Sequence, residues 1–135
     1  MMPYLLDTNV VSELRKRKPH GAVLAWIQKI PDASLHISAV TLGEIQAGVE
    51  LTRENDPVKA GEIERWLNEL EKTSNVIDVD AAVFRRWAQL MRGRADHHLE
   101  DALIAATALV HELTVATRNT ADFKPFGVKL INPFV

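Results

Sequence analysis

Four acidic side chains stand where an α/β protein could gather them at one edge of its sheet: Asp7, Glu44, Asp101 and Asp122. Asp7 follows the apolar run 4–6, past the expected carboxyl end of a strand, where open α/β sheets bind ligands. Four carboxylates within several ångströms repel one another, and burying them is costly. An all-oxygen cage of this kind suits Mg²⁺ or Mn²⁺ rather than zinc. Such a metal can activate water and neutralise charge on a phosphodiester.

Neutral hydrogen-bonding residues accompany these acids. Four of them flank the first and the last acid: Thr8, Asn9, Thr117 and Asn119. Hydroxyl and amide groups beside metal ligands commonly orient them. We therefore expect these four side chains to orient the carboxylates or a bound water.

Each acid also has a plainer interpretation. Asp7 could only cap the following helix, Asp101 could only complement a helix dipole, Glu44 could be solvated, and Asp122 could be an ordinary loop residue. The set favours the metal site, because three of the four fall at strand ends or helix N-termini on one expected sheet edge. Glu100 is expected to point about 100° away from Asp101 and to be solvated.

Strand and helix patterns alternate along the chain. Strands are expected at 3–6, 35–38, 76–79, 114–117 and, as an edge strand, 129–131. Helices are expected at 8–16, 23–30, 39–52, 57–72, 81–91 and 99–113, with a turn at 53–57 and a loop at 122–127. This alternation predicts an α/β fold with a parallel sheet covered on both faces.

Composition limits the class of protein. The 135 residues are 47% hydrophobic and 25% charged, which suits one domain with a buried core. The net charge of -2 does not indicate a nucleic-acid binder, although 15–18 form a local basic block. The chain has no cysteine, and its longest apolar stretch, 102–110, is too short to cross a bilayer. We expect a cytoplasmic protein without disulfides, thiolate metal sites or a membrane anchor.

Five short motifs follow one another over nearly the whole chain. They are LDTN at 6–9, SAVTLGE at 38–44, DALIAATA at 101–108, TRN with DF at 117–119 and 122–123, and NPF at 132–134. Together they resemble a PIN domain, specifically the VapC-type toxin of bacterial toxin–antitoxin pairs. The resemblance implies a single PIN domain over 1–135, a three-layer sandwich whose mostly parallel sheet of four to five strands is flanked by helices.

The same resemblance implies an activity and its partners. The activity is that of a Mg²⁺-dependent endoribonuclease, with Mn²⁺ as an alternative ion, whose metal-binding catalytic acids are Asp7, Glu44, Asp101 and Asp122. Transfer RNA is a frequent target in the family. The implied partner is a VapB-type antitoxin, which covers the site and provides the only contact with operator DNA. Homodimers are usual in the family. We expect the antitoxin to bind in a groove among the helices at 23–30, 39–52 and 57–72.

Two other functions fit part of this pattern. A phosphatase of the haloacid dehalogenase type also places an aspartate after its first strand, but it needs a second aspartate where this chain has Asn9. A non-catalytic corepressor that acts through its antitoxin would have no need of four clustered acids. Loss of toxicity in Asp7→Asn with retained antitoxin binding would separate a nuclease from a pure binder.

Overall fold

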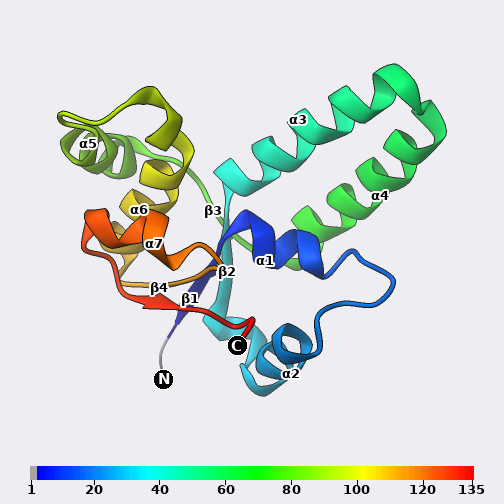
Figure 1. Cartoon of the computed structure of the whole chain (residues 1–135), viewed down its shortest axis with the longest axis horizontal. Helices are drawn as coiled ribbons and strands as arrows, with labels where there is room; N and C mark the ends of the chain where they lie inside the picture. Colours follow the sequence, from blue (N-terminus) through cyan, green and yellow to red (C-terminus); the bar gives the residue numbers. More distant parts are fainter. Residues whose placement is uncertain (1–2) are drawn as a thin grey trace.

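Five strands form one sheet in the order β3-β2-β1-β4-β5, and every neighbouring pair is parallel (Figure 1). The computed structural model describes residues 3–135, apart from the side chain of His97. The strands are β1 Tyr4–Leu6, β2 Leu35–Ser38, β3 Asn75–Ile77, β4 Thr114–Ala116 and β5 Leu130–Ile131. The predicted α/β class is confirmed, and within the described residues the sheet is entirely parallel.

Helices connect the strands and cover the sheet. They are α1 Thr8–Glu13, α2 Gly21–Lys29, α3 Ala39–Asn55, α4 Pro57–Thr73, α5 Ala81–Leu90, α6 Leu99–His111 and α7 Thr120–Phe123, with 3-10 turns η1 Asp32–Ser34, η2 Asp96–His98 and η3 Lys124–Phe126. Five of them begin where a side chain accepts a backbone N–H, at Asp7, His20, Ser38, Asp56 and Asp80. At Asp7 and Ser38 a strand therefore passes directly into the following helix, from β1 into α1 and from β2 into α3.

Two expected irregular segments are largely helical. The turn expected at 53–57 shrinks to Asp56, which ends α3 and accepts the Lys59 N–H to begin α4, while Pro57 needs no N–H partner there. The loop expected at 122–127 carries the end of α7 and the turn η3. Phe123 and Phe126 are both buried in the core, which holds that segment in place.

The sheet is buried on both faces, so that successive strand residues enter different cores. Leu5 and Val115 pack with α6, α7 and η3 on one face. Leu6 and Ala116 pack with α1, α2 and Phe134 on the other. Figure 1 shows the resulting layers, with α5, α6 and α7 on one side and α1, α3 and α4 on the other. This agrees with the three-layer arrangement that the resemblance implies.

The paired helices α3 and α4 extend beyond the sheet (Figure 1). Arg53 of α3 bonds Glu64 of α4 at 3.0 Å, and Gln46 donates to the same carboxylate at 2.9 Å. Among the described residues, no helix is both long and apolar enough to cross a membrane.

Candidate active site

Asp7 is held at the carboxyl end of β1 by three hydrogen bonds. Its Oδ1 accepts the Thr8 N–H at 2.8 Å, and its Oδ2 accepts the Thr117 hydroxyl at 2.8 Å and the Asn9 amide at 3.2 Å. The parallel register pairs Leu6 with Ala116, which brings Thr117 beside Asp7. The side chain is only 5% exposed. Burial raises the pKa of Asp7, and the Thr117 and Thr8 hydrogen bonds oppose this rise only in part.

Glu44 reaches the same region from α3. Ser38 caps α3 through a bond to the Val40 N–H, which fixes the helix directly after β2. The Thr8 hydroxyl donates to Glu44 Oε1 at 2.8 Å and lies 3.1 Å from the Thr41 hydroxyl. Thr41 is fully buried one turn before Glu44. Thr41 is a site residue that the sequence prediction missed, although its position on the Glu44 face was a usable signal.

Glu100 is exposed, as expected, but it also lies within hydrogen-bonding range of Glu44. Burial, a hydrogen bond with Glu100, and the charges of Glu100 and Asp7 raise the pKa of Glu44 to about 8, against the Thr8 hydrogen bond. Neighbouring helix residues diverge by about 100°, but α3 packs against α6. The side of α6 that carries Glu100, rather than the side that carries Asp101, therefore faces Glu44.

Asp101 and Asp122 complete the set from α6 and α7. Burial, followed by the charges of Asp7, Asp122 and Glu100, raises the pKa of Asp101 to about 6. The buried face of α6 is rich in alanine, so the helix lies close to the sheet and its first turn lies near β1. Asp122 is exposed in the first turn of α7, and its charge also raises the pKa of Asp7. The fold thus brings Asp7 within electrostatic reach of each of the other three predicted acids.

The orienting residues predicted from the sequence do not all act alike. Thr8, Asn9 and Thr117 contact the acids through their side chains. Asn119 instead donates its backbone N–H to the Thr117 hydroxyl at 3.0 Å, and its side chain is exposed. Asn119 therefore supports Thr117 through the main chain.

The donor chemistry suits a hard divalent cation. Within the part of the chain that the structure describes, no group of three or more acidic or histidine side chains is arranged so that it could hold a metal ion. The charged groups of the site are nevertheless all carboxylates, and the pKa of Asp7, of Glu44 and of Asp101 is raised by burial and by neighbouring acids. A cation bound among them would offset both effects.

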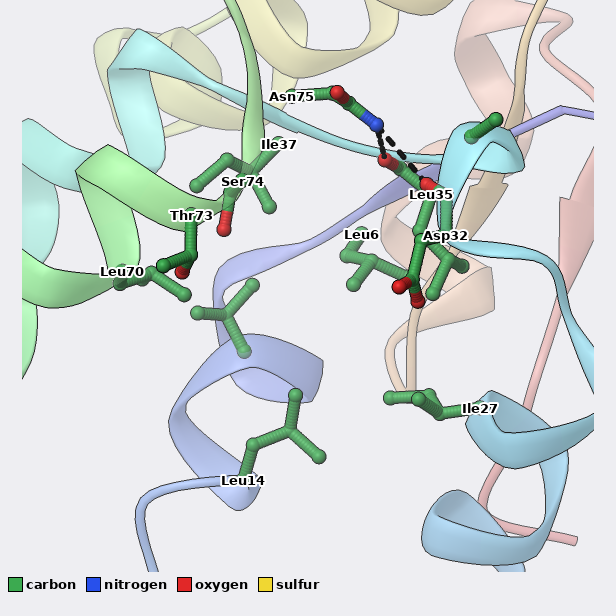
Figure 2. A pocket seen from close by; sticks show the side chains of 12 residues that line it. Leu6, Leu14, Ile27, Asp32, Leu35, Ile37, Leu70, Thr73, Ser74 and Asn75 are labelled. Atoms are coloured by element: carbon green, nitrogen blue, oxygen red, sulfur yellow. Dashed lines mark hydrogen bonds between the residues drawn. The ribbon is translucent and has the colours of Figure 1, made fainter.

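A hollow of about 440 Å³, lined by none of the four acids, lies between α1, α2, η1 and the end of α4 (Figure 2). Apolar side chains line much of it, among them Leu14, Ile27 and Leu70. Asn75 closes one side, where its amide donates to the Asp32 and Leu35 carbonyls at 3.0 and 2.9 Å. Neither the sheet nor one helix forms this hollow alone.

A family model described as the PIN domain matches residues 4–127. The chain belongs to the PIN domain family. It is 36% identical to "VapC ribonuclease Y4jK" of Sinorhizobium fredii, with 96% of each chain covered. It is 34% identical to "Toxin FitB" of Neisseria gonorrhoeae, with 96% of this chain and 97% of that one covered.

A solved structure of FitAB bound to an IR36 DNA fragment contains a similar chain, with a TM-score of 0.83 and 30% identity over 98% of this PIN chain and 96% of that one. These comparisons confirm the predicted family: the chain is a PIN-domain nuclease of the VapC toxin group. The roles of its individual residues stay predictions.

Proposed function

We propose that this toxin is an endoribonuclease that hydrolyses RNA phosphodiester bonds with Mg²⁺, or Mn²⁺, at Asp7, Glu44, Asp101 and Asp122. The observation that supports this most is that Asp7, at the end of β1, interacts electrostatically with acids of α3, α6 and α7 in a PIN-domain chain. In this proposal residues 1–135 form a single PIN domain. Transfer RNA is the first substrate to test.

The chain's own residues would prepare this chemistry. Asp7 and Asp101, helped by Glu44 and Asp122, would hold a divalent cation, whose contribution when bound is to activate water and to neutralise phosphodiester charge. Thr117 fixes the Asp7 carboxylate at 2.8 Å. The raised pKa of Glu44 lets its carboxyl retain a proton near neutral pH when no metal is bound.

We further propose a VapB-type antitoxin that neutralises the toxin by docking in the apolar hollow beside Leu14, Ile27 and Leu70 and extending to the acids. A solved toxin–antitoxin complex from Klebsiella pneumoniae, which contains a chain 26% identical to this one, supports an antitoxin partner. The hollow offers apolar side chains for a docked segment. Operator DNA would contact the complex only through the antitoxin, and the toxin would form a homodimer. Leu14→Glu should weaken antitoxin binding, whereas Leu24→Glu, at a site outside the hollow, should not.

Cleavage of total cellular RNA by the purified protein tests the nuclease proposal. The expected result is a discrete set of fragments with Mg²⁺ or Mn²⁺ and none with EDTA, and mapping of the fragment ends would name the RNA. No cleavage with either ion, from protein that still binds its antitoxin, would contradict the nuclease and favour the non-catalytic corepressor.

A further inference from the structure

Arg118 stands directly beside the acidic site but contacts none of its carboxylates. It follows Thr117, and its backbone N–H donates to Asn9 Oδ1 at 3.3 Å. Asn9 in turn donates to Asp7. The Arg118 guanidinium carbon lies 3.9 Å from the centre of the Phe134 ring. Its backbone is thus fixed to the site at one end and its charged group rests on an aromatic ring at the other.

The Phe134 ring that stacks on this guanidinium is itself held in place by several contacts. Its side chain is 9% exposed and packs in the core with Leu6 and Ala116. His20 contacts it edge to face, with 5.4 Å between ring centres, and the Phe134 N–H donates to Asn132 Oδ1 at 2.9 Å. A ring held in this way fixes the plane of a guanidinium stacked on it.

The N–H edge of Arg118 is not engaged by a carboxylate. Among the described residues it forms no ion pair within 4 Å, while the nearby Glu13 already accepts Lys16 Nζ at 3.0 Å and the His20 N–H at 2.9 Å. The Lys16 hydrogen bond is the main cause of the lowered pKa of Glu13, and the Arg118 charge adds least. Stacking on Phe134 uses the face of the guanidinium and leaves its edge for another acceptor.

We propose that Arg118 binds a backbone phosphate of the RNA strand that enters the acidic site. This inference rests on the proposed ribonuclease function. Clustered carboxylates repel phosphates, so a fixed cation beside them offsets that repulsion and sets the position of the strand. The planar fork of arginine matches phosphate oxygens in pairs, and a pre-oriented fork loses less entropy on binding. Arg118 is then a substrate-binding residue, and Phe134 is its positioning residue.

RNA binding and cleavage by variants of the full chain test this inference. The variants are Arg118→Ala, Arg118→Lys and Phe134→Leu, with Arg65→Ala as a control at an exposed arginine of α4. A labelled single-stranded RNA serves as the probe. Its anisotropy in EDTA gives Kd at several salt concentrations, and its cleavage with Mg²⁺ gives KM and kcat.

Arg118→Ala should raise Kd and KM roughly tenfold, as expected for one charge-assisted hydrogen-bonding group, with kcat within about twofold of wild type. The slope of log affinity against log salt should fall by about one, because one phosphate contact is lost. Arg118→Lys should bind with intermediate affinity. Phe134→Leu should raise Kd less than Arg118→Ala, and Arg65→Ala should match wild type.

Other outcomes separate the two proposals. If Arg118→Ala had the same Kd and salt slope as wild type, the phosphate contact of Arg118 would be overturned. RNA cleavage by wild type would still support the nuclease proposal in that case. A lower melting temperature with an unchanged salt slope would assign Arg118 only a structural role and would also overturn it. If wild type bound RNA but never cut it, the nuclease proposal would fail, and weaker binding by Arg118→Ala would still support this contact. Absence of RNA binding by wild type would overturn both.

Discussion

Replacing Asp101 by asparagine should stabilise the metal-free protein at pH 8. Burial and the charges of Asp7, Asp122 and Glu100 raise the pKa of Asp101 from 3.8 to about 6. Each pH unit of this difference corresponds to about 1.4 kcal/mol, which gives an upper bound of about 3 kcal/mol. Because Asp101 is only half-buried, solvent screening reduces the expected gain to roughly 1 kcal/mol. Asparagine removes the charge and nearly keeps the shape.

The gain should depend on pH in a defined direction. Below pH 3.8 the Asp101 carboxyl is protonated in the folded and in the unfolded chain, so asparagine gains little there. Between pH 3.8 and about 6 the unfolded chain ionises Asp101 more readily than the folded protein does, because the pKa is higher in the folded protein. The free energy of unfolding of wild type therefore falls over this range. Above pH 6 the difference between variant and wild type should be constant.

Urea unfolding of EDTA-treated protein at several pH values measures this difference, and a thermal scan at pH 8 should show a rise of about 3 to 5 °C for a chain of this length. Asp96→Asn is the matched control, because Asp96 is exposed and five residues away. A variant less stable than wild type at pH 8, or a difference that does not change with pH, would refute the reasoning. It would assign Asp101 to helix capping instead.

Three further predictions address other parts of the site. Thr117→Val removes a hydrogen bond that lowers the pKa of Asp7, so the acid limb of the cleavage pH profile should move to higher pH, with about 1 kcal/mol of stability lost in urea unfolding. Glu44 retains its proton to about pH 8 in the folded protein, so metal-free wild type should lose stability as the pH rises from about 4.5 to 8. Glu44→Gln should reduce this loss. Equal slopes of unfolding free energy against pH in the two proteins would contradict the prediction. Thr41→Val should weaken cleavage without loss of antitoxin binding, and unchanged kinetics would show that its contact with Thr8 is dispensable.

The sequence could predict features that depend on local pattern. Short runs of apolar and β-branched residues predicted the five strands, and the position of Asp7 after the first of them predicted its place at the sheet edge. Helix caps also depend on local sequence: Asp80, a residue type that favours the N-cap position, directly precedes α5 and accepts the Val83 N–H. The motif order predicted the family, which the comparisons confirm.

The sequence could not predict features that depend on how elements pack. Glu100 meets Glu44 only because α3 lies against α6, and no local pattern encodes that contact. Thr41 joins the site because Thr8 of another element faces it. Likewise the hollow beside Leu14 and Leu70 arises from several segments at once, so its existence follows from packing rather than from any one motif.

Cleavage of the identified RNA by Asp7→Asn, beside wild type and Asp96→Asn, tests the central claim most directly. Asp7 is the buried acid that three hydrogen bonds fix at the end of β1. Wild type and Asp96→Asn should cut with Mg²⁺ at similar rates, whereas Asp7→Asn should lose at least about a hundredfold in kcat while it stays folded and still binds antitoxin. Cleavage by folded Asp7→Asn at the wild-type rate would contradict the assignment of this site.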